Sequence, residues 1–277
     1  MYFDARPSLG DSGANMTRPQ LANAFTPRAG VLDLWEIDLA RPISESDRNL
    51  LTVEETAKAD RIIIESKQRQ SYRARAELRR ILARYLDAEP GALCFAYGEQ
   101  GKPALLPDPE RGPAPLCFNL SHSGTVGLVG VIFGAADEQL GVDVEEARPG
   151  REFASIAESF FAPDEVEVFR RLPSTEHTAA FYRAWTRKEA YLKAIGTGLS
   201  FASSAFSISF GRGEPARLLR TERAGDHPSR WRMIDVPCPA GYAAAACWSG
   251  APLELRHYFA PCSAPPLAAR GAYPPSI

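Results

Sequence analysis

The chain has 277 residues, a formal net charge of −2 at pH 7 and a hydrophobic content of 45%. These values predict a packed globular protein of one large or two ordinary domains. The 34 acidic and 32 basic residues nearly balance, which argues against a nucleic-acid-binding coat or a polybasic membrane patch. No stretch approaches about 18 apolar residues, so we expect no membrane-spanning helix. Five cysteines without a CxxC pair favour neither a disulfide framework nor a zinc site, and we expect a soluble cytoplasmic protein.

The first third of the chain is predicted to form a leader, one strand and a helical segment. Residues 1–28 are rich in Gly, Pro, Ser and Ala without periodicity, which is typical of a flexible leader. Residues 31–40 alternate apolar and polar side chains, as a half-buried strand does. Residues 45–86 have a helical pattern with a break near Ser66, and the second helix carries arginines at 73, 75, 79 and 80. Such arginines are commonly solvated; a phosphate-binding cluster is the alternative.

Two turns then present polar groups. A short strand ending at residue 97 leads into a turn that displays Lys102. Residues 117–133 are predicted to form a strand, a bend with Ser121, His122, Ser123 and Gly124, and a long apolar strand. Such a bend can cradle an anion with its amides and side chains, and it is equally compatible with an ordinary hairpin turn.

The segment 139–147 is predicted to be a strand that carries two carboxylates on one face. Because side chains alternate along a strand, Asp143 and Glu145 face one side while Val142 and Val144 enter the core. Neighbouring carboxylates repel each other, and a hard cation such as Mg²⁺ would relieve the repulsion. The alternative is a solvated strand end.

Residues 153–172 are predicted to form two short helices that meet at Pro163. Glu165 lies in the first turn of the second helix. Its ordinary role there would be to interact with the helix dipole, and the alternative is a third acidic group near the metal.

The next helix is predicted to carry chemistry on one face. Trp185, Glu189 and Lys193 recur every four residues, and Gly196 ends the helix. Taken alone, this pattern is also typical of an amphipathic helix with an ion pair on its solvent-exposed face. Together with the carboxylate strand it suits a polyanionic ligand that carries a divalent cation.

The last third of the chain is predicted to be a sheet. Apolar segments at 206–210, 217–221, 231–236, 242–248 and 253–259 indicate antiparallel strands, and the Pro- and Ala-rich residues 261–277 indicate a tail. The order of elements is loosely repeated on the two sides of residue 137.

Four motifs, taken in order and spacing, resemble the 4'-phosphopantetheinyl transferases of the Sfp type. They are GKP at 101–103, FNLSHSG at 118–124, GVDVEE at 141–146 and WTRKEAYLKAIGTGL at 185–199. The resemblance spans about residues 31–250. It implies an α+β fold of two similar subdomains arranged as a pseudo-dimer, at residues 29–137 and 138–260, with the active site in the cleft between them.

The resemblance also implies a reaction. The 4'-phosphopantetheine group of coenzyme A would pass, with Mg²⁺, to a serine hydroxyl of an apo acyl or peptidyl carrier protein and release adenosine 3',5'-bisphosphate. Such carriers serve fatty-acid, polyketide or nonribosomal-peptide biosynthesis. We expect no nucleic-acid or membrane partner, and a monomer because one chain holds both halves.

The resemblance implies roles for individual residues. For Mg²⁺ it implies Asp143, Glu145 and Glu189. For the phosphates it implies Lys193 at the pyrophosphate, Lys102, Ser121 and His122 at the nucleotide, and Lys58 at the adenosine 3'-phosphate. The chain departs from the family at a second basic position, where Glu55 stands, and this shifts part of the 3'-phosphate contact to Arg75 or Arg79. Glu189 is the first candidate for the base that deprotonates the serine, and Glu165 is the second.

Two other functions stay open. One is a non-catalytic module that binds coenzyme A, and the intact set of three carboxylates argues against it. The other is a subunit that docks a carrier protein through Phe160, Phe161 and Leu199, although those side chains could equally be core.

Overall fold

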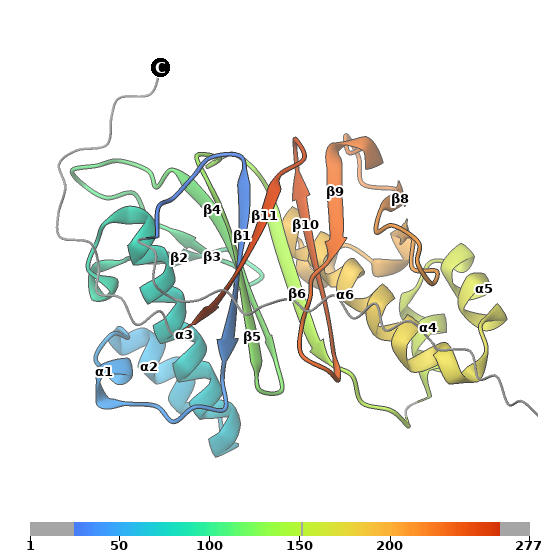
Figure 1. Cartoon of the computed structure of the whole chain (residues 1–277), viewed down its shortest axis with the longest axis horizontal. Helices are drawn as coiled ribbons and strands as arrows, with labels where there is room; N and C mark the ends of the chain where they lie inside the picture. Colours follow the sequence, from blue (N-terminus) through green and yellow to red (C-terminus); the bar gives the residue numbers. More distant parts are fainter. Residues whose placement is uncertain (1–24, 151, 261–277) are drawn as a thin grey trace, which may run out of the picture.

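A computed structural model describes residues 25–150 and 152–260 (Figure 1). The leader at residues 1–24 and the tail at residues 261–277 lie outside the described residues. Phe25 falls within the predicted leader, but it is 8% exposed and packs edge-on against Trp35 and Tyr85. The packed core therefore includes residues before 29.

The first half contains five strands and three α-helices among the described residues. They are β1 (Val31–Asp38), α1 (Glu45–Arg48), α2 (Val53–Asp60), α3 (Glu65–Leu86), β2 (Phe95–Tyr97), β3 (Pro103–Leu105), β4 (Leu116–Ser123) and β5 (Val126–Phe133), with a 3-10 helix at Pro90–Ala92. The predicted break near Ser66 was incomplete, because the helical segment is divided twice. Thr52 and Glu55 form a capping box that starts α2, and α3 begins at Glu65.

The second half continues the chain with six strands and three α-helices in the described range. They are β6 (Leu140–Glu146), α4 (Phe153–Phe160), α5 (Pro163–Arg171), α6 (His177–Ile195), β7 (Phe206–Ile208), β8 (Leu218–Thr221), β9 (Trp231–Asp235), β10 (Tyr242–Ser249) and β11 (Glu254–Ala260). Short 3-10 helices lie at Ser174–Glu176, Gly198–Ser200, Ser203–Ala205 and Pro228–Arg230. Gly196, with φ 73°, ends α6 in the left-handed conformation that the sequence predicted.

The two halves repeat one topology. β5 lies between β1 and β4 and is antiparallel to both, and β10 lies in the same way between β6 and β9. In each half a first strand is followed by helices, a two-stranded ribbon and two further strands. The predicted α+β fold with two similar halves is therefore confirmed, and the boundary near residue 138 stays a proposal.

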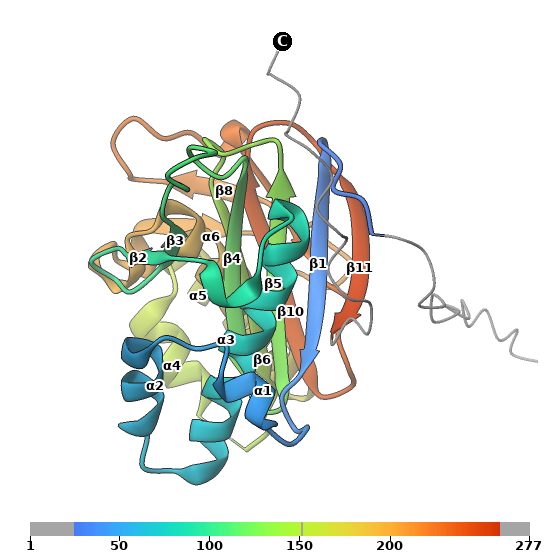
Figure 2. The same cartoon turned by 90° about the vertical axis from the view of Figure 1, so that its left-hand side faces the viewer.

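The strands after α6 do not form the one antiparallel sheet that was predicted. β7 and β8 make a separate ribbon, and β9 and β10 join β6. β11 returns to the first half, where it lies parallel to β1 along the edge of that sheet (Figure 2). The polar pattern of β11 could not reveal this partner, because strand pairing over more than 200 residues depends on the whole fold.

Helices cover the outer faces of the two sheets (Figure 1). The aliphatic side chains of α3 pack with Trp35 and Val129 of the first sheet, and α6 packs against Ala245 and Cys247 of the second. A third apolar cluster, which includes Leu32, Val142 and Trp248, is shared by the two sheets. The described residues contain no helix long and apolar enough to cross a membrane.

Candidate active site

The carboxylate strand has the predicted alternation. Asp143 and Glu145 lie on one face of β6, while Val142 and Val144 are fully buried in the cluster shared by the sheets. Asp143 is only 2% exposed. A buried carboxylate is tolerated where charges or hydrogen bonds compensate it, and its partners come from β4 and α6.

Alternate side chains of β4 hold β6 in place. Three acceptors on β4 bind three amides of β6: Asn119 Oδ1 with Val142 (2.8 Å), Ser121 Oγ with Val144 (3.4 Å) and Ser123 Oγ with Glu146 (3.1 Å). We call Asn119, Ser121 and Ser123 the β4 ladder. Its two hydroxyls also donate, Ser121 to Asp143 Oδ1 at 2.9 Å and Ser123 to Glu145 Oε2 at 2.7 Å. The strand of one half thus orients the carboxylates of the other.

Lys193 of α6 completes this junction. Its Nζ donates to Asp143 Oδ1 at 2.6 Å and to Ser121 Oγ at 2.8 Å. The ammonium group therefore pairs with the strand carboxylate rather than with Glu189 one turn earlier on its own helix. Because its side chain remains 29% exposed, Lys193 can still reach an anion in the cleft.

Glu189 faces the same carboxylates. Its pKa is raised, first by burial and next by the negative charge of Asp143, with a smaller contribution from Glu145, while Lys193 opposes the rise. The three predicted acidic groups therefore act on one another electrostatically, and a bound cation would relieve their repulsion.

The donor set fits Mg²⁺ only if other oxygens complete it. Asp143 Oδ2 is buried without a hydrogen-bond partner, which is the state expected of an oxygen that binds a cation. In the described part of the chain, however, no three His, Cys, Asp or Glu side chains are arranged to hold a metal by themselves. Mg²⁺ commonly takes one or two carboxylates and fills its remaining positions with water and substrate phosphate.

A glycine lets α6 lie directly on β6. A Cβ atom at Gly141 would stand 2.0 Å from the carbonyl oxygen of Ala190 and 2.4 Å from the amide nitrogen of Ala194. The helix backbone therefore rests on the strand backbone two residues before Asp143, which sets the distance from Asp143 to Lys193.

Lys102 lies where the two halves meet, but it is not displayed as predicted. Its Nζ donates to the carbonyl oxygens of Leu140 (2.9 Å) and Lys193 (2.7 Å), and burial lowers its pKa to about 8. The sequence could not reveal that the lysine caps the last turn of α6. Lys102 also lines a cleft of about 190 Å³, together with Asn119, Leu192 and Lys193.

Ser121 and His122 lie on β4 itself, and only Gly124 and Thr125 form the bend. The hydroxyl proton of Ser121 is directed to Asp143, so the residue meets a phosphate only if that contact is exchanged. His122 remains exposed at the surface of the strand. Nearby protein atoms still desolvate the imidazole ring, and this lowers the pKa of His122. The positive charges of Lys193 and Lys67 lower the pKa further.

The basic residues proposed for the 3'-phosphate separate into two groups. Lys58 is exposed and lies 5.2 Å from the centre of the Tyr97 ring, so it remains available to an anion. Arg79 is 0% exposed and is occupied by Glu55 and by two backbone carbonyls. Arg75 pairs with Glu55 at 2.6 Å. Arg79 is thus structural, which corrects its predicted binding role.

The arginines of α3 are more buried than the sequence indicated. Arg73 is 6% exposed and pairs with Asp47 and Glu77, and Arg80 pairs with the same two carboxylates. The sequence contains a signal for these buried ion pairs, because Ser44–Asp47 and Thr52–Glu55 form capping boxes that direct carboxylates inward at two helix starts.

Glu165 binds other partners than the cluster of Asp143, Glu145 and Glu189. It is 2% exposed, and its oxygens accept the amides of Ala162 and Ile208 and the Nζ of Lys188. Burial raises the pKa of Glu165, and Lys188 opposes that rise. We therefore correct its prediction as a second base: Glu165 caps α5 and neutralises a buried lysine.

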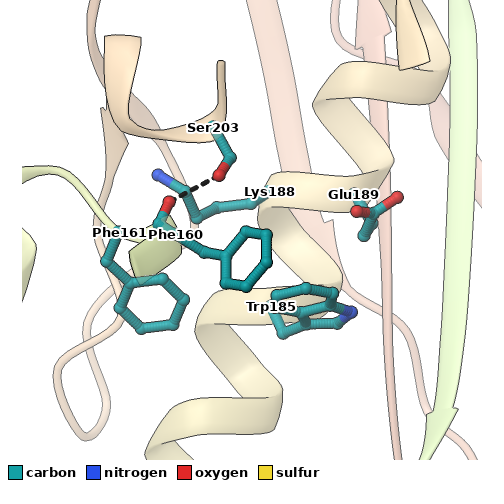
Figure 3. Close-up of a pocket in the computed structure, with 6 residues that line it drawn as sticks. All are labelled: Phe160, Phe161, Trp185, Lys188, Glu189 and Ser203. Atoms are coloured by element: carbon teal, nitrogen blue, oxygen red, sulfur yellow. Dashed lines mark hydrogen bonds between the residues drawn. The ribbon is translucent and has the colours of Figure 1, made fainter. Parts of the chain in front are cut away.

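An aromatic pocket adjoins Glu189 (Figure 3). Phe160 is 40% exposed and meets Trp185 edge-on, whereas Phe161 is 2% exposed and belongs to the core. The side chain of Leu199 lies outside the described part of the structure. Phe161 therefore cannot belong to the predicted docking surface, because successive side chains at the end of α4 point alternately to solvent and to the core.

Ser123 and Asn119 were missed as site residues. The signal was present as two alternations, N-x-S-x-S at 119–123 and D-x-E at 143–145, which match in period and direction. The sequence did not show that these two strands lie side by side.

Comparison with known proteins gives one consistent family. The model of the 4'-phosphopantetheinyl transferase superfamily matches residues 139–247. The 4'-phosphopantetheinyl transferase HetI of Nostoc sp. is 38% identical over 187 residues, which are 67% of this chain and 76% of HetI. A relative from Synechocystis sp. is 38% identical over 167 residues, so that the match spans 60% of this chain and 65% of the relative.

Two more distant similarities were found, one to a curated relative and one to a solved structure. The 4'-phosphopantetheinyl transferase Sfp of Bacillus subtilis is 26% identical over 183 residues, covering 64% of this chain and 76% of Sfp. Among solved structures, the holo-[acyl-carrier-protein] synthase of Thermotoga maritima is 21% identical with a TM-score of 0.32, and the match covers 43% of this chain and 64% of that one.

Proposed function

The chain belongs to the 4'-phosphopantetheinyl transferase superfamily, and we propose that it carries out this family's reaction at the cluster of Asp143, Glu145, Glu189 and Lys193. Enzymes of this family transfer the 4'-phosphopantetheine group of coenzyme A to a carrier protein, and this chain is one of them. The observation that supports our site is the junction in which Ser121, Asp143 and Lys193 contact one another across the two halves.

The reaction breaks the phosphoanhydride bond of coenzyme A and forms a phosphodiester on the carrier serine. The oxygen of the carrier serine bonds to the phosphorus that bears pantetheine, and the bond from that phosphorus to the bridging oxygen breaks. The leaving group is adenosine 3',5'-bisphosphate, a polyanion. Catalysis by this chain therefore rests on neutralising charge and holding the phosphates in line.

Lys193 supplies a fixed positive charge at the pyrophosphate in this proposal. Its contact with Asp143 orients the ammonium group before substrate arrives, and its partial exposure leaves room for a phosphate oxygen. Lys102 lines the adjoining cleft and His122 stays exposed beside Ser121, which supports assigning both to the nucleotide phosphates. Lys58 is exposed, and we assign it to the 3'-phosphate.

Asp143, Glu145 and Glu189 would hold Mg²⁺. The orphan Oδ2 of Asp143 and the raised pKa of Glu189 support this assignment. When bound, Mg²⁺ neutralises charge on the pyrophosphate oxygens.

Glu189 is our candidate for the base that accepts the serine proton. It lines the pocket with Phe160 and Trp185, so it borders a surface that an incoming protein can approach. Glu165 is unsuited to the role because it is buried and both of its oxygens already accept hydrogen bonds from groups of its own half. A positioned carboxylate of this kind contributes about 10²–10⁴-fold to the rate.

The assembly and the location are two further inferences. One chain supplies β4 from its first half and β6 and α6 from its second, so we infer that a monomer is sufficient for activity. We further infer that it acts in the cytoplasm, on apo acyl or peptidyl carrier proteins.

Intact-mass spectrometry tests this proposal. Apo carrier protein is incubated with the enzyme, coenzyme A and Mg²⁺, beside a chelated control, and we expect a gain of one phosphopantetheine only where Mg²⁺ is present. Asp143→Ala should abolish the gain, whereas Asp137→Ala, at an exposed aspartate in a turn, should not. No gain across carriers of several kinds, with coenzyme A still bound, would favour the binding-module alternative.

A further inference from the structure

Ser123 has a hydroxyl whose hydrogen bonds all lead to β6. It donates to Glu145 Oε2 at 2.7 Å and accepts the amide of Glu146 at 3.1 Å. A hydroxyl has one proton, and here the amide fixes its acceptor side, so the proton is directed to the carboxylate. The direction of this bond is therefore set by the backbone of the strand that carries Glu145.

The segment around Ser123 is itself fastened. Tyr242 Oη, from β10, accepts the amide of Thr125 at 2.9 Å. Gly124 has φ 54°, and a Cβ there would stand 2.4 Å from the same Tyr242 oxygen, so the bend and β10 are in close contact. The hydroxyl of Ser123 is thus a fixed point to which the longer side chain of Glu145 is attached.

The side chain of Glu145 is longer than that of Asp143 and has more conformational freedom to lose. A glutamate has one more rotatable bond than an aspartate, and ordering its side chain costs up to about 2 kcal/mol. Asp143 accepts hydrogen bonds from Ser121 and from the ammonium group of Lys193, and Glu145 accepts one from Ser123.

We propose that Ser123 is a positioning residue that sets the Glu145 carboxylate for the divalent cation. This inference rests on the proposed function, because it takes Glu145 as one of the metal-binding groups. Ser123 does not touch the reacting atoms; it acts through Glu145. Groups that orient a metal-binding carboxylate typically change metal affinity by about 10- to 100-fold when removed.

Direct binding of Mn²⁺, measured by electron paramagnetic resonance without coenzyme A, tests the proposal apart from activity. We expect Ser123→Ala to raise the Kd for Mn²⁺ by about tenfold and Ser123→Thr, which keeps the hydroxyl, to remain within about threefold of the wild type. Ser155→Ala is the matched control, since that exposed hydroxyl only donates to the Glu152 carbonyl.

A double-mutant cycle shows whether Ser123 works through Glu145. In a Glu145→Ala background, Ser123→Ala should weaken Mn²⁺ binding no further. In transfer assays, Ser123→Ala should raise the KM for Mg²⁺ while kcat at saturating Mg²⁺ stays within about threefold, a split that a general loss of folding would not produce.

Three outcomes would overturn the proposal. An unchanged Kd in Ser123→Ala, with Glu145→Ala impaired, removes the role of Ser123 and leaves the metal assignment standing. An equal loss from Ser123→Ala with and without Glu145 shows that the serine acts elsewhere. Wild-type Mn²⁺ binding in Glu145→Ala removes the proposed metal role of Glu145 and the positioning role with it.

Discussion

Replacing Gly141 by alanine should separate the two elements that carry the site. The added Cβ would lie 2.0 Å from the Ala190 carbonyl oxygen, while ordinary contact begins at 3.4 Å, so α6 and β6 must move apart by about 1.4 Å. The helix cannot yield locally, because Ala190 and Ala194 are 0% and 2% exposed. Overpacking of this kind costs about 3 kcal/mol of folding stability. A misplacement of about 1 Å lowers a rate by about 100-fold, and Lys193 would move relative to Asp143 by at least that much.

Two measurements check this expectation. The free energy of unfolding is obtained from urea titration, and kcat/KM from the formation of holo carrier protein. Gly91→Ala is the control, since no atom lies within 4 Å of its Cβ position. A Gly141→Ala protein that transfers at the wild-type rate would refute the reasoning that this backbone contact sets the geometry of the site.

Other substitutions separate catalysis, binding and stability. Glu189→Ala should lower kcat by about 1,000-fold without changing the melting temperature, and a rate within tenfold of the wild type would remove Glu189 as the base. Lys188→Met should lower the free energy of unfolding, measured by urea titration, by about 3–5 kcal/mol, because Glu165 is left buried without its cation. Adding Glu165→Gln to this variant should recover most of the loss, and no recovery would contradict the pairing. Lys58→Ala should raise the KM for coenzyme A by about fivefold with an unchanged melting temperature, because it removes one exposed phosphate contact. Arg79→Met should instead lower the melting temperature, because Arg79 is buried, and the reverse pattern would return Arg79 to the binding site.

Much of the local structure was predictable because it follows from periodicity. The alternation over 140–146 correctly separated Asp143 from Val142, and the glycine at 196 correctly marked the end of α6. These patterns are local, so a single strand or helix is sufficient to interpret them.

What failed was the choice of partner. The sequence showed that Glu165 begins a helix, but not that Lys188, from a helix further along the chain, occupies it. It showed a lone lysine in a turn, but not that two carbonyl groups accept from Lys102. Charged side chains with several possible partners are assigned only by tertiary packing, and this is why the site's cations were harder to predict than its carboxylates.

The parallel pairing of β11 with β1 governs the order in which the protein can fold during synthesis. Asp33 of β1 is 1% exposed, and its cationic partner Arg256 lies 223 residues later in the chain. Domains commonly fold from the N-terminus while the ribosome is still translating. Here we expect the first half to complete its sheet late, because its edge strand and the cation for Asp33 emerge only after α6 and β10 have been made. The β4 ladder is therefore assembled on a sheet whose edge strand is made after α6 and β10, so that a chain interrupted before β11 leaves Asp33 without this cation.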